Sequence, residues 1–344
     1  EDGGRSRRTS LFLRGEGYGL RQYHDTDYLA VSAALHARLS NMLGQERLER
    51  MLEAPTAADA WKTAAQCGYP ELEECTLDAV EEALAAARRE LYRELRTLSP
   101  DERLIEFFQI KYDYHNAKAA LKAGEDGGVE HLLIDCGRCD AHRLARGELN
   151  TAPAALRRAA EAAKDELERS GDAQRADMLL DRACFEEMAA LARGTGSAFL
   201  RDYAALQVDA VNLRTLVRSL RMGREGEFLS AALLPGGHIA PQRFAAAHGT
   251  EIAELLRGSP LEKAAELAPA LSAGGSLTEF ERLCDDALMD YLRAARRAPF
   301  GEKVVIGYLG AKEAEFTAVR TVLAGKLAGL DAGAIRARLR ETYL

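Results

Sequence analysis

The 344-residue chain is poor in aromatic residues, which make up 6% of it, and it lacks long alternations of β-branched and polar residues. Both absences argue against a β-sheet, because strands are enriched in Val, Ile, Tyr and Phe. Ala, Leu, Arg and Glu dominate instead, and these residues favour helices. With 47% hydrophobic and 29% charged residues, the composition is that of a globular protein with a real core. We therefore expect an all-α fold.

Long apolar runs are missing as well. No stretch approaches the roughly 18 apolar residues of a membrane-spanning helix. Leu11-Phe12-Leu13, behind a basic stretch, is too short for the core of a signal peptide. We therefore expect a cytoplasmic protein whose six cysteines stay reduced. The net charge of −8 is opposite in sign to that of electrostatic nucleic-acid binders, so no nucleic-acid partner is expected.

Catalytic motifs are the third absence. The sequence contains neither the Gly-x4-Gly-Lys-Ser/Thr phosphate loop nor the Gly-x-Ser-x-Gly nucleophile motif. Carboxylate pairs such as Glu73-Glu74 and Asp285-Asp286 are sequential neighbours, which point in different directions on a helix. We expect no enzymatic activity of this chain alone and no bound cofactor.

One cluster has the atoms of a metal site: His131, Cys136, Cys139 and His142. Two thiolates and two imidazoles suit tetrahedral zinc. However, no second Cys pair follows, and the His spacing fits no common zinc finger. A redox Cys-x2-Cys pair is another interpretation of the same residues. We favour ordinary surface or half-buried residues, with no metal bound.

A helical segment recurs three times, at 107–122, 203–218 and 309–324. In each copy an acid is followed five residues later by a base, and the first two copies share an Asn that the third replaces by Ala318. The polar positions are Asp113, Asn116, Lys118, Asp209, Asn212, Arg214, Glu315 and Arg320. The apolar positions form one stripe in the same register, which predicts threefold internal repetition.

The acid and base of each copy lie about 140° apart around the helix, so they cannot face each other. One hypothesis is that each pairs with another helix and fixes how the long helices cross. The alternative is a pair of solvated charges, which contribute little to stability.

Arg214, Arg218 and Arg221 form a basic ridge along one helix. Like charges at this spacing repel one another and weaken the helix. An acidic partner surface would relieve the repulsion, so the ridge is a candidate partner contact. The alternative is a solvated ridge that is neutralised by acids of the same chain.

Turn signals divide the chain into a mobile N-terminal arm, 1–25, and three units, 26–124, 125–225 and 226–344. Each unit has short helices followed by two long ones. The long helices are expected near 77–98 and 100–123, near 174–193 and 198–222, and near 278–295 and 302–328. A last short helix is expected near 332–341. Ser99, followed by Pro100 and Glu102, predicts the capping box that begins the second long helix.

Short fragments that match one family occur in order along the chain: Leu52-Glu53-Ala54-Pro55, Gly68-Tyr69, Tyr112 to Lys118, Leu180-Asp181-Arg182, Phe185, Val208-Asp209, Asn212 to Leu216, Leu234 to Gly237, Phe300-Gly301, Tyr308-Leu309, Lys312-Glu313, Glu315, Lys326-Leu327 and Gly329-Leu330. Taken in order, these fragments resemble the C subunits of the archaeal/vacuolar-type (A/V-type) rotary ATPases, which are homologous to the d subunit of the eukaryotic V-ATPase (AC39 family). The resemblance extends from about Tyr28 to Leu344, and Ala318 departs from the Asn usual in the repeated motif.

The resemblance implies three helical-bundle units related by a pseudo-threefold axis and forming a funnel-shaped body. It implies a non-catalytic central-stalk subunit, a socket between the rotor-shaft subunits and the membrane proteolipid ring. Such a subunit is peripheral to the membrane and serves proton or sodium transport that is linked to ATP hydrolysis or synthesis. Two alternatives stay open: a helical-repeat adaptor of another complex, and a zinc or redox protein that uses Cys136 and Cys139.

Overall fold

The computed structural model describes residues 22–123 and 128–344, and every regular element in these ranges is a helix. The expected all-α fold is therefore confirmed. The predicted N-terminal arm lies almost entirely outside the described residues, as does most of the predicted linker at 124–128.

The helices follow one another in three stretches. The first contains η1 (Asp25–Tyr28), α1 (Leu29–Leu39), α2 (Gln45–Glu53), α3 (Ala57–Ala65), α4 (Leu77–Leu98) and α5 (Arg103–Ala123). The second contains η3 (Glu130–Leu132), α6 (Ala141–Ala145), η4 (Leu149–Thr151), α7 (Ala154–Ser170), α8 (Ala173–Thr195) and α9 (Ala198–Arg221). The third contains α10 (Glu227–Ala232), α11 (Pro241–Ala246), α12 (Glu251–Leu255), α13 (Glu262–Ser272), α14 (Thr278–Arg293), η5 (Ala294–Arg297), α15 (Glu302–Leu327) and α16 (Ala332–Arg336).

The long helices match their predicted ranges closely, but two details of the sequence prediction are wrong. Asp101, not Ser99, caps α5: Asp101 Oδ1 accepts from the Arg103 N–H at 3.0 Å. Ser99 instead ends α4, and its hydroxyl donates to the carbonyl of Asp101 at 3.0 Å. The last helix ends at Arg336, so residues 337–344 form a tail without a regular helix.

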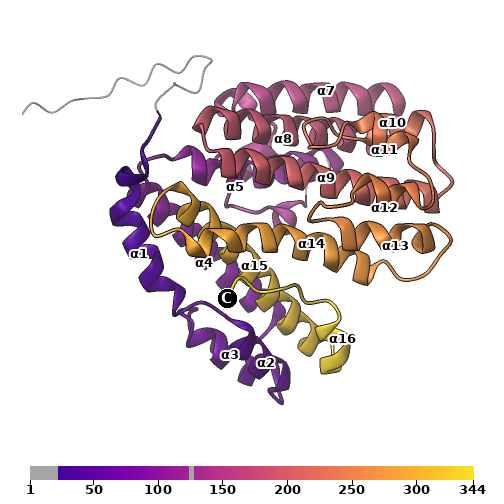
Figure 1. Cartoon of the computed structure of the whole chain (residues 1–344). Helices are drawn as coiled ribbons and strands as arrows, with labels where there is room; N and C mark the ends of the chain where they lie inside the picture. Colours follow the sequence, from indigo (N-terminus) through magenta and orange to yellow (C-terminus); the bar gives the residue numbers. More distant parts are fainter. Residues whose placement is uncertain (1–21, 124–127) are drawn as a thin grey trace, which may run out of the picture.

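Six of the long helices in the described ranges form a closed series of contacts. α4 contacts α5, α5 packs on α8, α8 on α9, α9 on α14, and α14 on α15, which returns to α4. In Figure 1, α7, α8 and α9 lie side by side with α14 below them, and α15 crosses beneath α14 toward α2 and α3. The last long helix, α15, is thereby packed against the N-terminal part of the chain.

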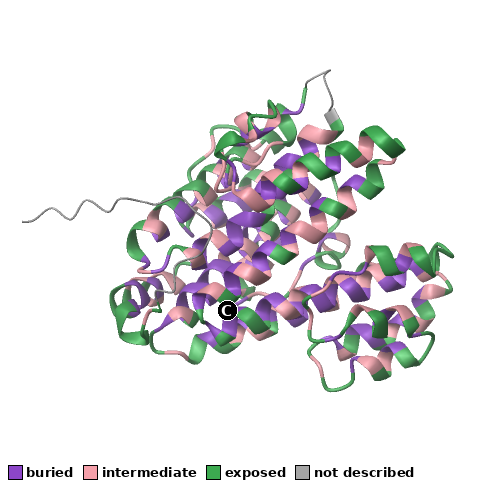
Figure 2. Ribbon diagram, turned by 90° about the horizontal axis from the view of Figure 1, so that it is seen from above, coloured by how far each residue is buried: buried purple, intermediate pink, exposed green. Residues whose placement is uncertain are grey.

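Burial follows this arrangement. Figure 2 shows buried residues concentrated in the middle of the molecule and exposed ones on its outer helices. One apolar cluster joins α1–α5, α7, α8 and α15, and a second lies between α9 and α10–α14. α15 is buried along much of its length, and two of its glycines allow a close approach. A Cβ at Gly307 would lie 2.6 Å from Ala295 Cβ, and one at Gly310 would lie 2.3 Å from Leu292 Cδ1.

Candidate functional site

The first copy of the repeated motif binds a loop rather than a helix. Asp113, on α5, is fully buried, and its Oδ1 accepts from the backbone N–H groups of Arg138 (2.9 Å) and Cys139 (3.0 Å). Its Oδ2 accepts from Arg138 Nε at 2.7 Å. One turn further on, the Asn116 amide donates to the Ile134 carbonyl and accepts from the Ile134 N–H, both at 2.9 Å. Together they hold the loop 134–139 against α5.

The second copy repeats this geometry on α9. Asp209 accepts from the backbone N–H groups of His238 (3.0 Å) and Ile239 (3.2 Å), and from His238 Nδ1 at 2.9 Å. The Asn212 amide donates to the Leu234 carbonyl and accepts from the Leu234 N–H, both at 2.8 Å. The loop 234–239 is therefore held against α9 as 134–139 is held against α5. We call each such contact between a motif acid and the loop that it binds a clamp. In the first two clamps an amide also binds the loop.

A glycine lies directly against the acid in both clamps. A Cβ at Gly137 would come within 2.2 Å of Asp113 Oδ1, and one at Gly237 within 2.1 Å of Asp209 Oδ1. No L side chain fits at such a distance, so both positions require glycine. These two glycines are the feature of the sequence that could have predicted the clamps. Their equivalence becomes clear only when the two loops are aligned with each other.

The third copy binds a loop from the other end of the chain. Glu315, on α15, accepts from the Leu43 N–H at 2.7 Å, from the Tyr69 hydroxyl at 2.8 Å and from Lys312 Nζ. Ala318 stands where the other copies have Asn, so this clamp has no amide. The third acid thereby ties the last long helix to the segment between α1 and α2.

The bases of the motif bind acids on neighbouring long helices. Lys118 pairs with Asp181 on α8, Arg214 with Glu281 and Asp285 on α14, and Arg320 with Glu81 on α4. The hypothesis of pairing with another helix is therefore correct for the bases and wrong for the acids. A buried carboxylate needs several donors, and a turn of loop backbone offers adjacent N–H groups that a neighbouring helix does not.

Burial has electrostatic consequences for the acids. It raises the pKa values of Asp113 and Asp209, while the hydrogen bonds that their loops donate act in the opposite direction. Each carboxylate is thus confined to a site where only its own loop compensates its desolvation.

A charged cluster that the sequence prediction missed lies beside the clamps. Glu313, on α15, accepts from Tyr92 Oη and Lys111 Nζ, both at 2.7 Å, and from the Tyr112 hydroxyl. Burial alone would raise the pKa of Glu313, but Lys111 and Arg88 hold it at about 2. Lys111 and Glu313 occupy equivalent positions of the repeat. Their opposite charges could therefore have predicted this ion pair from the sequence.

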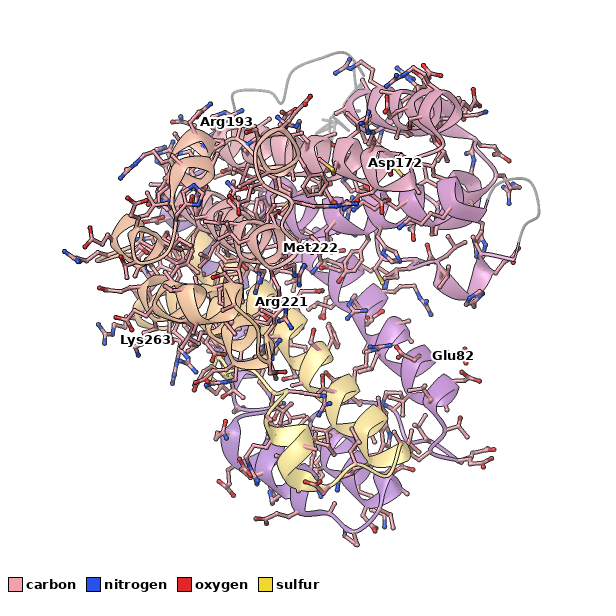
Figure 3. The ribbon with its side chains drawn as sticks, turned by 90° about the vertical axis from the view of Figure 1, so that its right-hand side faces the viewer. Glu82, Asp172, Arg193, Arg221, Met222 and Lys263 are labelled. Atoms are coloured by element: carbon pink, nitrogen blue, oxygen red, sulfur yellow. The ribbon has the colours of Figure 1, made fainter. Side chains whose placement is uncertain are left out.

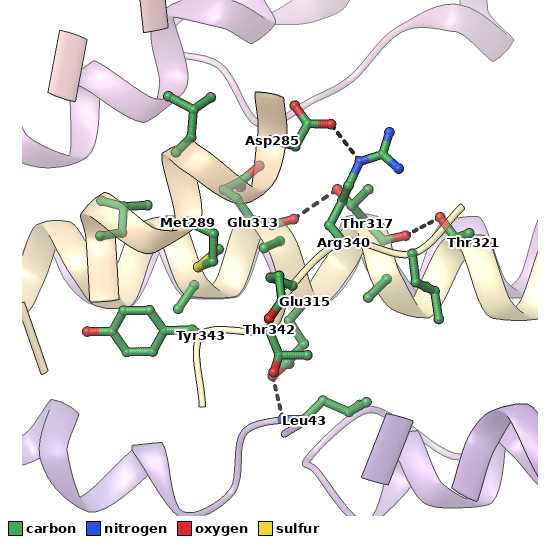
Figure 4. Close-up of a pocket in the computed structure, with 18 of the residues that line it drawn as sticks. Leu43, Asp285, Met289, Glu313, Glu315, Thr317, Thr321, Arg340, Thr342 and Tyr343 are labelled. Atoms are coloured by element: carbon green, nitrogen blue, oxygen red, sulfur yellow. Dashed lines mark hydrogen bonds and ion pairs between the residues drawn. The ribbon is translucent and has the colours of Figure 1, made fainter. Parts of the chain in front are cut away.

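A cavity of about 380 Å³ lies next to this cluster (Figure 4). All three motif helices contribute to its lining: Lys111 from α5, Tyr203 from α9 and several residues of α15, Thr317 and Thr321 among them. The tail closes one side, where Arg340 Nε donates to Asp285 Oδ2 at 2.6 Å. The repeated motif and the tail therefore meet around one space.

The four residues of the candidate zinc site, His131, Cys136, Cys139 and His142, lie in and around the loop that Asp113 binds. In residues 22–123 and 128–344, no three His, Cys, Asp or Glu side chains are placed to hold a metal ion. Burial raises the pKa of Cys136 to about 11 and that of Cys139 to about 12, which disfavours thiolate chemistry. Cys136 and Cys139 belong to the loop that Asp113 binds, and His131 and His142 lie on η3 and α6 on either side of it.

The three arginines of the basic ridge donate hydrogen bonds to groups of the same chain. Arg214 and Arg218 both bind Glu281, and Arg221, which Figure 3 shows near the end of α9, donates to the Gly275 carbonyl at 2.7 Å. Contacts within the chain therefore relieve the repulsion within the ridge in part, and the predicted contact with an acidic partner stays a prediction. Acids of the same chain, the alternative, bind Arg214 and Arg218, whereas Arg221 binds a neutral carbonyl.

Fold and site together define an all-helical protein in which a repeated motif organises packing. None of the described helices is both long and apolar enough to cross a membrane. The family described as "ATP synthase (C/AC39) subunit" matches residues 31–338, and the chain belongs to this family.

Relatives cover nearly the whole chain. It is 21% identical to the C subunit of the V-type sodium ATPase of Enterococcus hirae, over 92% of this chain and 99% of that protein. It is 27% identical to the C subunit of the V-type ATP synthase of Thermus thermophilus, over 92% and 98%. The C subunit of an A-type ATP synthase from Haloferax volcanii is 27% identical over 69% of this chain and 73% of its own length.

Proposed function

We propose that this chain is the non-catalytic central-stalk subunit of a V/A-type rotary ATPase. It acts as the socket that couples the rotor shaft to the membrane proteolipid ring, on the cytoplasmic side of the membrane. The complex transports protons or sodium ions and hydrolyses or makes ATP. Membership of the family supports the assignment to such a complex. The single observation that carries the socket role is the closed series of contacts among the long helices.

The clamps support a ring of three units at 26–124, 125–225 and 226–344. The last long helix of each unit binds a loop near the start of the next: α5 binds 134–139, α9 binds 234–239, and α15 binds Leu43. The base of the same helix pairs with the long helix that precedes the motif helix of that next unit. Because the third unit returns to the first, the pattern favours a pseudo-threefold ring over an open superhelix.

Contacts at one end of this ring support the proposed funnel shape. There the turns between the long helices are joined: Arg103 Nη1 donates to the Gly194 carbonyl at 2.7 Å, and the Ser197 hydroxyl donates to Glu302 Oε1 at 3.2 Å. Toward the other end, the bases of the motif helices bind the neighbouring unit rather than one another. A body closed at one end and open at the other suits the foot of a shaft.

Stiffness is the physical requirement of a torque coupler. A close-packed interior transmits strain instead of absorbing it, and buried, fully bonded polar groups fix one arrangement of the units. The acids of the three clamps and Glu313 are all engaged in this way in the described structure. Their role as structural links supports a non-catalytic subunit.

The experiment is affinity purification of the tagged full-length chain from its native membranes, with identification of the bound proteins. The expected result is recovery of the shaft subunits and the proteolipid ring in one complex. The isolated chain is expected to show no ATP turnover. Recovery of an unrelated complex without shaft or ring would establish the alternative of a helical adaptor and overturn the proposal.

A further inference from the structure

A second, smaller group of charges lies beside the central cavity. A recess of about 460 Å³ is lined by three arginines and one acid: Arg218 of α9, Arg338 and Arg340 of the tail, and Glu281 of α14. Leu277, Thr278 and Thr321 complete its lining. This excess of positive charge stands out in a chain whose net charge is −8.

The acids around the recess are shared among more bases than they can neutralise. Glu281 accepts from Arg214 Nε at 2.7 Å and from Arg218 Nη2 at 2.6 Å. Asp285 accepts from Arg214 and, at 2.6 Å, from Arg340 Nε. Two carboxylates therefore serve three guanidinium groups.

Arg338 adds a fourth positive charge without adding an acid. The hydrogen bond of its guanidinium runs from Nη1 to the Ala334 carbonyl at 2.6 Å, and this acceptor is neutral. The other acids of the adjoining cavity are engaged elsewhere. Glu313 binds Lys111, Glu315 binds Lys312, and Glu341 binds Arg293.

The tail holds these arginines in place. Arg293 Nε donates to the Thr342 carbonyl at 2.8 Å, and the Glu341 N–H donates to Asp286 Oδ1 at 2.7 Å. Leu339 and Tyr343 are buried, so the segment is anchored on both sides of Arg340. Arg338 is exposed and the Arg218 side chain is 55% exposed, so both are accessible from solvent.

We propose that Arg218, Arg338 and Arg340 form a docking site for carboxylate side chains of an acidic protein segment. This inference rests on the proposed function and identifies the partner segment as an acidic stretch of the rotor shaft that enters the cavity. Guanidinium groups bind carboxylates through two parallel hydrogen bonds, and an excess of fixed charge speeds the encounter with a partner of opposite sign. The bound carboxylate supplies the neutralisation that Arg338 lacks among the described residues.

The test compares binding of purified shaft subunits to the full-length chain and to Arg218→Gln/Arg338→Gln. The Kd of the double variant is expected to rise about tenfold at low salt, and its salt dependence to weaken. Arg257→Gln is the matched control, because this side chain is 70% exposed and pairs with Glu254 within its own turn. The control is expected to bind like the wild type. A double variant that binds the shaft as tightly as the wild type would overturn the inference.

A second arm separates this inference from the proposed function. If the wild-type chain does not bind the shaft at all, the proposed function fails, and the recess is still testable with a hexaglutamate peptide. The peptide is expected to bind the wild type and to lose most of its affinity for the double variant. Inorganic phosphate, titrated in the same way, is expected to bind at least tenfold more weakly than the peptide. Equal peptide binding by both chains, or tighter binding of phosphate, would contradict a carboxylate site.

Discussion

At the scale of single residues, the clamps show how little of a buried polar site a sequence displays. The acid, the amide and the base of each repeat are visible as a recurring pattern in the sequence. The partners of the acids are not, because a loop donates through backbone N–H groups that every residue but proline has. Only Gly137 and Gly237 indicate the contact between acid and loop in the sequence, since a Cβ at either would collide with its Asp.

The first prediction concerns Gly237. Gly237→Ala places a Cβ against Asp209 Oδ1, so the loop has to move and the buried carboxylate loses donors. We expect the free energy of unfolding to fall by about 3 kcal/mol, measured by urea denaturation. Gly44→Ala is the control, because a Cβ there would lie 3.5 Å from Leu344 Cβ, an ordinary contact. Equal stability of the two variants would mean that the clamp does not constrain the loop.

The second prediction concerns Glu313 and pH. Its pKa is lowered from 4.5 to about 2, so the stability it contributes is fully present above pH 4.5 and is lost as the pH falls toward 2. The shift corresponds to about 3 kcal/mol. Between pH 5 and 3 the wild type should therefore lose stability more steeply than Glu313→Gln, which has no titrating group at position 313. Parallel pH profiles of the two proteins in denaturation experiments would contradict this assignment.

At the scale of elements, sequence patterns place the long helices well because each has an apolar stripe bounded by turn or capping residues. Thr76 and Ser197, for example, accept hydrogen bonds from the first turns of α4 and α9. The helix predicted over the tail is wrong for a tertiary reason. The Glu341 N–H, which a continuing helix would direct to the Ala337 carbonyl, donates instead to Asp286 Oδ1 of α14.

The third prediction belongs to the contact of α9 with α14. A double-mutant cycle on Arg214 and Glu281, with each residue changed to Ala, should give a coupling of about 1–2 kcal/mol, because both side chains are mostly buried. The exposed pair Lys62 and Asp59, within one turn of α3, is the control and should give a much smaller coupling, because solvent screens it. Thermal or urea unfolding measures both cycles. Additive effects at Arg214 and Glu281 would show that the pair does not link the helices.

At the scale of the whole molecule, the third clamp differs from the other two. The loops bound by α5 and α9 follow these helices closely along the chain, but Glu315 reaches back to Leu43. Sequence repetition predicts three similar units, yet it cannot indicate that the last binds the first, because that contact joins distant segments. We infer that this junction is the weakest of the three, since Ala318 removes the amide that the other clamps have.

The fourth prediction tests that junction. Glu315→Ala leaves the Leu43 N–H and the Tyr69 hydroxyl without their acceptor. Amide hydrogen exchange should therefore quicken in α1, α2 and α3 and stay unchanged in α8 and α9. Asp113→Ala is the matched variant, and its effect should be confined to the loop 134–139 and its surroundings. Uniform loss of protection in both variants would indicate that the clamps do not define separate junctions.

The most direct test of the socket role is cryo-electron microscopy of the complex that is purified through the tagged chain. We expect density for this chain on the rotation axis between the shaft and the proteolipid ring, with α5, α9 and α15 arranged around the foot of the shaft. A chain bound at the periphery of the complex, or a shaft that reaches the ring without touching these helices, would contradict the socket role.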